Sequence, residues 1–300
     1  MRPWFLLAIA TTSLVVDSAC LNVEASEDYT GASKKKKGTS SGTNEDDPAD
    51  TTDKNDPSTS SSGTNARADA GATVRDNGTH GTGGPNGAGG NTELTSASGL
   101  RFRIDAANTG DKPHGLLVLL HGSSASNYTN MVGMMSAVAQ TYDLIRVSVL
   151  APNGQGWNEG DQPGAAEKLH QLVQQDLFAK YNIDKTRVMF SGQSSGAGFL
   201  ASHFIALHAA DYRGGAFLQC GANAPFNNFT PDDATKAGFK MHFEITSADP
   251  IWPQQYAAGT AKYASLGMQL TKDNSKPGGH CAFDQQAVIQ AHIGFVLGTP

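Results

Sequence analysis

The sequence predicts an α/β domain in which a mostly parallel sheet carries helices on both faces. Across residues 99–300, apolar runs of strand length alternate with longer stretches of helical periodicity. One apolar run ends in Gly192-Gln193-Ser194-Ser195-Gly196, a pattern typical of a tight turn from a strand into a helix. Alternation of this kind is characteristic of parallel sheets, because parallel strands need crossover connections that are usually helices.

Residues 1–20 predict an export signal. A single basic residue precedes an apolar core that is too short to cross a bilayer. Signal peptidase would cut near Ser18-Ala19; alternatively, Cys20 becomes a lipidated first residue, as in bacterial lipoproteins. Asp17 stands where the lipoprotein pattern has Leu or Val, so both interpretations stay open. We expect an exported protein that is extracellular, or attached to the cell surface or periplasmic membrane through Cys20.

Residues 21–98 predict a disordered polar linker. Ser, Thr, Gly, Asp, Asn and Lys dominate, and large apolar side chains are almost absent. Such a segment cannot bury enough apolar surface to offset the entropy lost on ordering. The net charge of the whole chain is −6, which gives no reason to expect nucleic acid as a partner.

The strands and helices of residues 99–300 follow from two patterns. The continuous apolar run 115–120 ends in His121-Gly122 and predicts a buried central strand. Residues 164–181 carry apolar side chains at helical spacing and predict a helix with one apolar face. By the same criteria we expect strands at 100–104, 144–151, 188–191, 214–220 and 240–246, and helices at 131–141, 199–210, 254–266 and 283–297.

Ser194 is the candidate nucleophile. A serine held on a sharp strand-to-helix turn needs glycine two places before and after it, here Gly192 and Gly196, because a Cβ there would collide with neighbouring backbone. The turn also directs the amide of Ser195 toward the place where an oxyanion would form.

A serine hydroxyl needs a base within hydrogen-bond reach and a carboxylate that holds that base, and on this fold the chain order is serine, acid, histidine. Asp249 follows the strand expected at 240–246, at the sheet edge where open sheets carry their chemistry. His280 lies in a glycine loop ahead of the last helix, whereas His292 lies within that helix, where we expect a packing or surface role. The predicted catalytic residues are therefore Ser194, Asp249 and His280.

Two backbone amides would complete the site as an oxyanion hole. They belong to Ser195 and to Ser123, in the loop after the central strand. Trp157 and Asn158 follow an early strand and are candidate substrate-binding residues, although Trp157 is equally interpretable as part of the core. This chemistry requires neither a metal nor an organic cofactor.

The chain has three cysteines. With Cys20 in the signal region, Cys220 and Cys281 are either a disulfide formed in an oxidising compartment or two separate buried thiols.

Several motifs together resemble the polyhydroxybutyrate depolymerase and feruloyl esterase group of secreted α/β-hydrolases, an esterase family 1-like group. The resemblance covers residues 115–283 in the family's order and implies an α/β-hydrolase fold without a large lid. It also implies the same three catalytic residues, with an oxyanion donor at Ser123, where the family often has cysteine. The motifs are Pro152-Asn153-Gly154, Trp157-Asn158, Tyr181-Asn182-Ile183-Asp184, Arg187-Val188, the turn around Ser194, Asp249 and Gly279-His280.

The chain departs from this family in two places. Ala197 replaces the second of two glycines that usually follow the serine turn, and Cys281-Ala282 follows His280 where relatives place an aromatic residue shortly afterwards. Tannase-like relatives join a cysteine just before the serine to one after the histidine. Gln193 occupies the first position here, so a corresponding bridge would run from Cys281 to Cys220.

The resemblance implies a secreted or surface-anchored serine carboxylester hydrolase that works through an acyl-enzyme. The ester would be carbohydrate-linked, aromatic or of the polyester type, and the only expected partners are this substrate and, through Cys20, a membrane. Two alternatives stay open: a hydrolase fold that serves as a non-catalytic surface-binding module, and a peptidase of the same fold.

Overall fold

The structure, a computed structural model, describes residues 81–84, 90–106, 112–125 and 127–298. All of them belong to the compact unit Ala68–Pro300. The predicted export signal 1–20, including Cys20, and residues 21–80 of the predicted linker lie outside the described residues. No helix in the described part of the chain is both long enough and apolar enough to traverse a bilayer.

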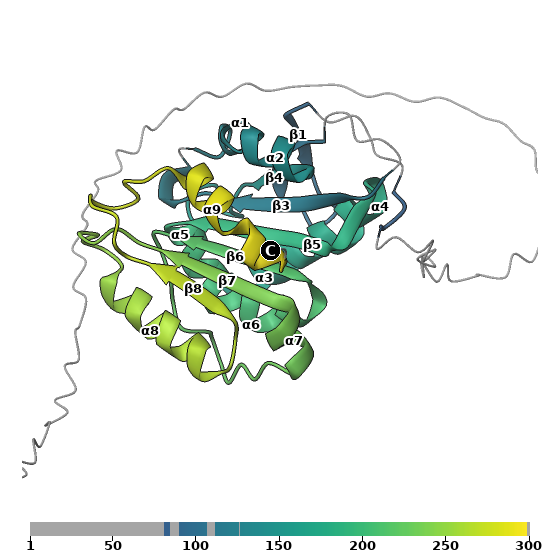
Figure 1. The fold of residues 1–300 in the computed structure, drawn as a ribbon. Coiled ribbons are helices and arrows are strands. Elements are labelled where there is room, and N and C mark those ends of the chain that lie inside the picture. Colours follow the sequence, from purple (N-terminus) through teal and green to yellow (C-terminus); the bar gives the residue numbers. More distant parts are fainter. Residues whose placement is uncertain (1–80, 85–89, 107–111, 126, 299–300) are drawn as a thin grey trace, which may run out of the picture. The chain divides into compact units, whose positions relative to one another are not determined.

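One eight-stranded sheet organises this unit, with the strand order β1-β2-β4-β3-β5-β6-β7-β8 (Figure 1). The pairs β1–β2 and β2–β4 are antiparallel, and every other neighbouring pair is parallel. β3, β4 and β6 are buried along their whole length, as continuous apolar runs predict. The strands are β1 (Thr92–Thr95), β2 (Arg101–Asp105), β3 (His114–Leu120), β4 (Leu144–Val149), β5 (Ile183–Gln193), β6 (Gly214–Gln219), β7 (Phe239–Glu244) and β8 (Leu270–Asp273).

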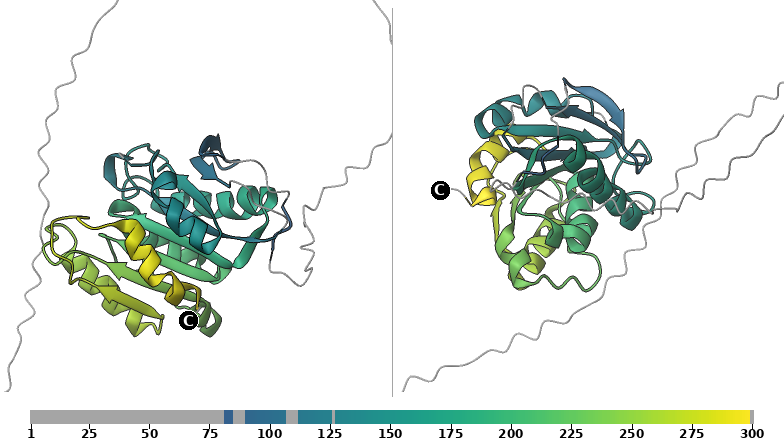
Figure 2. Two further views of the ribbon diagram at one scale, coloured as in Figure 1. Left: turned by 45° about the horizontal axis from the view of Figure 1, so that its top comes forward. Right: turned by 90° about the vertical axis from the view of Figure 1, so that its right-hand side faces the viewer.

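Helices cover both faces of the sheet (Figures 1 and 2). α1 (Met131–Met134), α2 (Ser136–Tyr142) and α9 (Gln285–Leu297) pack on one face, against side chains such as Leu117 and Met189. The other face packs against α3, the helix after β5, and α8, through neighbours such as Val118 and Phe190. Because successive strand residues point to opposite faces, each central strand contributes to both cores. The helices of the second face are α3 (Gln162–Gln171), α5 (Ser195–Phe199), α6 (Ile205–His208) and α8 (Pro253–Ser265).

Three of the predicted helices differ in detail from those observed. The helix expected at 199–210 begins at Ser195 and contains a π-helical turn, Leu200–Phe204, between α5 and α6. The helix expected at 131–141 is divided into α1 and α2 at Met135, whose φ of −94° and ψ of 16° leave the helical region. The helix expected at 164–181 begins earlier, at Gln162, because Asp161 caps it by accepting a hydrogen bond from the amide of Gly164. It continues through a π-helical turn, Leu172–Leu177, into α4 (Phe178–Lys180).

The prediction of a disordered linker up to residue 98 is wrong for its last part. β1 pairs with β2, and the amide of Gly83 donates a hydrogen bond of 3.0 Å to Asn182 Oδ1. All four residues of β1 are exposed, so main-chain hydrogen bonding rather than apolar burial places this strand. Composition therefore carries little information about it.

Two further elements, β8 and α7 (Asp233–Gly238), were not expected either. Both are short and largely polar, and β8 is an edge strand with no fully buried residue. β5 also begins five residues before the expected strand 188–191. The sequence did not predict this first part because its residues are mostly polar.

Candidate active site

The turn after β5 holds Ser194 in a conformation that few side chains adopt. Its φ of 48° and ψ of −112° lie outside the usual regions for a residue other than glycine. A Cβ on Gly192 would lie 2.5 Å from the backbone nitrogen of Ala197, and one on Gly196 would lie 2.7 Å from the carbonyl oxygens of Leu120 and His121. The expectation that both positions need glycine is confirmed.

The structure brings the three predicted catalytic side chains into one hydrogen-bonded chain. His280 Nε2 lies 2.8 Å from Ser194 Oγ, and His280 Nδ1 lies 2.7 Å from Asp249 Oδ2. They come from three separate loops, each at the carboxyl end of a strand or just ahead of α9. The arrangement is that of a nucleophile, a base and a group that orients the base.

Asp249 is fixed by main-chain donors as well as by His280. Its Oδ1 accepts hydrogen bonds from the amides of Ile251 at 2.8 Å and Trp252 at 3.1 Å, and its side chain is fully buried. Burial alone would raise the pKa of this carboxyl, but the bonds from His280, Ile251 and Trp252 together bring the pKa below its ordinary value. Because an ionised carboxylate can only accept, the imidazole proton lies on Nδ1, and Nε2 is left to accept from the serine hydroxyl.

The loop that carries His280 is attached to the sheet on both sides of the histidine. Thr246 Oγ1 donates a 2.9 Å hydrogen bond to the carbonyl of Gly279, just before the imidazole. Just after it, Cys281 forms a disulfide with Cys220, at the end of β6. Of the two interpretations that the sequence left open, the structure contains the disulfide.

Removing this disulfide should destabilise the protein strongly. The bridge closes a loop with a sequence separation of 61 residues, for which the chain-entropy model gives about 4 kcal/mol. We expect the double variant Cys220→Ala/Cys281→Ala to lose about this free energy of unfolding in urea. Intact mass of the unreduced and reduced chain checks the bond itself, since reduction adds two hydrogen atoms to the parent and none to the variant. Two titratable thiols at these positions in the native, unreduced protein would contradict it.

The two residues predicted to be oxyanion donors lie close together. A Cβ on Gly156 would lie 3.6 Å from Ser195 Oγ and 3.7 Å from Ser123 Cα, so these three residues meet at one place. Ser195 begins α5 and Ser123 begins the short turn Ser123–Ala125. Amides in the first turn of a helix have no intrahelical acceptor, so the amide of Ser195 is suited to bind an oxyanion, whereas the role of the Ser123 amide stays a prediction.

The structure separates the two predicted substrate-binding residues. Trp157 is only 1% exposed, and its ring lies 4.9 Å from that of Phe199, so the prediction that it lines the site is wrong. The loop after β4 turns the indole inward beneath α5, where apolar burial outweighs exposure at the site. Asn158 is exposed, and its Oδ1 would lie 3.3 Å from a Cβ on Gly198, one helical turn beyond Ser194. Its substrate-binding role stays a prediction.

Two neighbours of this position were not expected from the sequence. Trp252 and Asn223 also border Gly198, where an added Cβ would lie 2.7 Å from Trp252 Cη2 and 3.2 Å from Asn223 Nδ2. Since the backbone amide of Trp252 also donates to Asp249, Trp252 contacts both the acid and the helix that carries the nucleophile. The sequence signal for Trp252 is its position three residues after the candidate acid Asp249.

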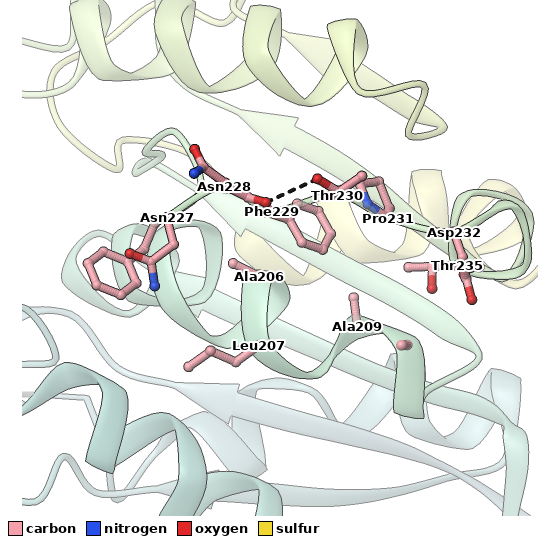
Figure 3. A pocket seen from close by; sticks show the side chains of 12 residues that line it. Ala206, Leu207, Ala209, Asn227, Asn228, Phe229, Thr230, Pro231, Asp232 and Thr235 are labelled. Carbon is pink, nitrogen blue, oxygen red and sulfur yellow. Dashed lines mark hydrogen bonds between the residues drawn. The ribbon is translucent and has the colours of Figure 1, made fainter.

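A hollow of about 850 Å³ lies elsewhere on the molecule, between α6 and the loop that follows β6 (Figure 3). Leu207, Phe226 and Phe229 contribute apolar side chains to it, and Thr230 Oγ1 donates a hydrogen bond to the carbonyl of Asn228 at its rim. Ser194, Asp249 and His280 are not among its lining residues. The hydrogen-bonded group of Ser194, Asp249 and His280 is therefore separate from this hollow.

The other histidines near the sheet have structural partners. His121 is fully buried, accepts the amide of Ala151 at Nε2 and bonds the carbonyl of Gly122 through Nδ1, and burial lowers its pKa. His292 stacks on His242 with ring centroids 3.6 Å apart, which agrees with the packing role expected for it.

Comparison with known proteins identifies the fold. No family model and no curated protein sequence matches the chain. Similar solved structures include a thermostable esterase (TM-score 0.53, 15% identity, covering 69% of this chain and 62% of that one). A carboxylesterase from Mesorhizobium loti has TM-score 0.54 and 19% identity over 66% of this chain and 95% of that one. An acetyl xylan esterase from Aspergillus awamori has TM-score 0.53 and 16% identity over 68% of this chain and 98% of that one.

The chain thus spans less than two thirds of the thermostable esterase and nearly all of the other two. The described unit has the α/β-hydrolase fold, as predicted, with a mostly parallel sheet and helices on both faces. Within the described residues, no inserted domain separates the strands. At these identities the likeness establishes the fold, and the activity has to be argued from the site.

Proposed function

We propose that this protein is a serine carboxylester hydrolase that works through an acyl-enzyme. The observation that carries the proposal is the chain of hydrogen bonds from Asp249 through His280 to Ser194. That the similar solved structures include a carboxylesterase and an acetyl xylan esterase favours an ester over a peptide as substrate.

In this mechanism Ser194 Oγ attacks the ester carbonyl carbon while its proton moves to His280 Nε2. Asp249 stabilises the resulting imidazolium, and the amides of Ser195 and Ser123 bind the oxyanion of the tetrahedral intermediate. His280 then returns the proton to the departing alcohol oxygen as the C–O bond breaks. A water molecule repeats the sequence on the acyl-enzyme, releasing the carboxylic acid and restoring the serine hydroxyl.

Our proposal for the substrate class is supported by the solvent access of the site. The His280 side chain is 23% exposed, and the exposed Asn158 lies beside the helix that carries Ser194. An open site of this kind suits an ester on a bulky alcohol or acid, and we propose carbohydrate-linked, aromatic or polyester-type esters. The acetyl xylan esterase among the similar structures acts on the first of these classes by its name.

We also propose that the protein works outside the cytoplasm, exported through residues 1–20 and either released or anchored at Cys20. The Cys220–Cys281 disulfide supports this proposal, because such bonds persist mainly in oxidising compartments.

Active-site labelling tests the reaction class. We expect a fluorophosphonate to add to one residue of the full chain, with loss of fluoride, and peptide mass mapping to place the adduct on Ser194. The matched variant Ser194→Ala should remain unlabelled and should not turn over a panel of acetyl, butyryl and feruloyl chromogenic esters. A parallel anilide of the same acyl groups separates an esterase from a peptidase.

Two other outcomes would each favour one of the alternative functions. Faster turnover of the anilide than of the ester would favour the peptidase. A folded protein that neither labels nor hydrolyses any ester would contradict the proposal and favour a binding module on a hydrolase fold.

A further inference from the structure

A second group of histidines and carboxylates lies on α3 and on the far end of the helical segment that begins at Ser195. The inference drawn from it does not depend on the proposed ester hydrolysis. His170 comes from α3, and His208 and Asp211 come from the end of the helix that begins at Ser195. The two imidazole rings stack, with centroids 4.2 Å apart and an interplanar angle of 12°. His208 is buried, His170 is half-buried and Asp211 is exposed, so the group opens to the surface on one side.

The distances within this group are longer than hydrogen bonds. Asp211 Oδ2 lies 3.6 Å from His208 Nδ1 and 3.8 Å from His170 Nδ1, beyond the range in which a nitrogen donates to an oxygen. Ligand atoms bound to Zn²⁺ at about 2.0–2.1 Å in a tetrahedral site lie about 3.3 Å from one another. We propose that His170, His208 and Asp211 bind a Zn²⁺ ion, with water in the fourth position. Because the two rings are stacked in the structure, they turn about their Cβ–Cγ bonds on binding, so that both Nδ1 lone pairs point at the ion.

The Glu167 carboxylate lies near the second ring nitrogen of His208. His208 Nε2 is buried without a hydrogen-bond partner in the structure and lies 3.7 Å from Glu167 Oε2. When Nδ1 binds the ion, the proton lies on Nε2, and a small movement of the exposed Glu167 side chain lets it accept that proton's hydrogen bond. Zinc-bound histidines in proteins commonly donate their second N–H to a carboxylate in this way.

The other histidine can also present its nitrogen. His170 Nδ1 lies 3.0 Å from the hydroxyl of Tyr212. The O–H of Tyr212 can rotate about its C–O bond away from this nitrogen, which frees the Nδ1 lone pair for a metal.

His242, Glu244 and His292 form a comparable group at β7, but its carboxylate already has a cationic partner. There Glu244 already accepts hydrogen bonds from Lys276 Nζ at 2.8 Å and from His242 Nε2 at 3.1 Å, and a lysine ammonium occupies the place of a cation. Glu167 and Asp211, by contrast, face the His170–His208 group with no lysine or arginine among the ion pairs described for them. Two carboxylates beside two imidazoles favour a divalent cation.

The ion would stabilise the fold and not take part in ester hydrolysis. His208 follows Ser194 by 14 positions along one continuous helical segment, which corresponds to about 21 Å. A metal here joins α3 to the end of the helix that begins at the nucleophile. We expect a rise in melting temperature of about 5 °C when Zn²⁺ is present at a hundred times its dissociation constant.

Calorimetric titration of Zn²⁺ into the chelator-treated full chain tests the proposal. We expect one high-affinity equivalent, with affinity about 100-fold weaker in His208→Ala and in Asp211→Asn, and about 10-fold weaker in Glu167→Gln. His203→Ala is the matched control, because His203 lies on the same helical segment but contacts Phe226 and Ser202. Its affinity should equal that of the parent, and comparison between variants cancels binding elsewhere on the chain.

Co²⁺ in place of Zn²⁺ gives an independent readout, since tetrahedral coordination produces visible absorption bands that the Asp211→Asn variant should lack. If His208→Ala does not fold, the exposed Asp211 and Glu167 variants decide the question. Equal Zn²⁺ affinity in the parent, His208→Ala and Asp211→Asn, or no high-affinity equivalent in the parent, would overturn the proposal. Ester turnover is a separate measurement and bears only on the proposed function.

Discussion

The His280→Ala variant is expected to lose about a millionfold in kcat for ester hydrolysis. The serine hydroxyl has a pKa far above neutral, and in the structure the acceptor within reach of its proton is His280 Nε2, at 2.8 Å. Alanine leaves the nucleophile protonated and the departing alcohol without a proton donor. Because nucleophile and base act as a unit, removing either one costs nearly as much as removing both.

The matched control is His292→Ala. His292 is the other histidine that follows Asp249 at a helix near the chain's end, and it stacks on His242 at 3.6 Å instead of facing the serine. We expect its kcat to stay within a few-fold of the parent, with loss confined to stability. Steady-state hydrolysis of one ester by both variants, at matched circular dichroism, decides between the two histidines. A large loss in His292→Ala with activity preserved in His280→Ala would refute the assignment.

The Asp249→Asn variant is expected to lose about 10⁴-fold in kcat while keeping its fold. Asp249 Oδ1 accepts from the amides of Ile251 and Trp252, and an asparagine preserves those bonds only if its carbonyl oxygen takes that position. Its NH₂ group then faces His280 Nδ1, which must accept. The imidazole proton moves to Nε2, and this nitrogen can no longer take the proton of Ser194.

Asp233→Asn is the control for this substitution. Asp233 precedes β7 in the chain and is fully exposed at the start of α7, so removing its charge should leave kcat unchanged. Pre-steady-state measurement of the acylation step checks that the loss in Asp249→Asn falls on chemistry and not on substrate binding. Acylation at the parent rate in Asp249→Asn would contradict the proposed role of the carboxylate.

The lowered pKa of Asp249 also has a consequence for stability. Its hydrogen bonds stabilise the ionised form in the folded state, so this contribution is complete above the unfolded aspartate pKa of about 3.9 and disappears as pH falls through the lower, folded value. The difference in unfolding free energy between the parent and Asp249→Asn should therefore be constant at neutral pH and decrease below about pH 4. Urea unfolding at several pH values measures it.

The sequence was sufficient where structure follows from local pattern. The continuous apolar run of β3 and the glycines around Ser194 identify a buried strand and a strained turn, because backbone sterics and burial act over a few residues. The order of Ser194, Asp249 and His280 identified residues that the structure then brings within hydrogen-bond distance.

Where two local patterns are equivalent, the sequence left the choice open. Trp157 follows a strand just as Asn158 does, and only the packing against Phe199 shows that one side chain turns inward and the other outward. Likewise β1 is made of exposed residues in a polar segment, and it is a strand because β2 presents an edge to it.

By itself, then, the sequence determined the sheet's central strands, the serine turn and the order of the catalytic candidates, since each depends on neighbours along the chain. Tertiary structure alone decided the pairing of Cys220 with Cys281, the inward turn of Trp157, the part played by Trp252, and the meeting of His170 with His208 and Asp211. These contacts depend on how the helices and loops around the sheet are placed in space. Periodicity and spacing within a single segment do not specify that placement.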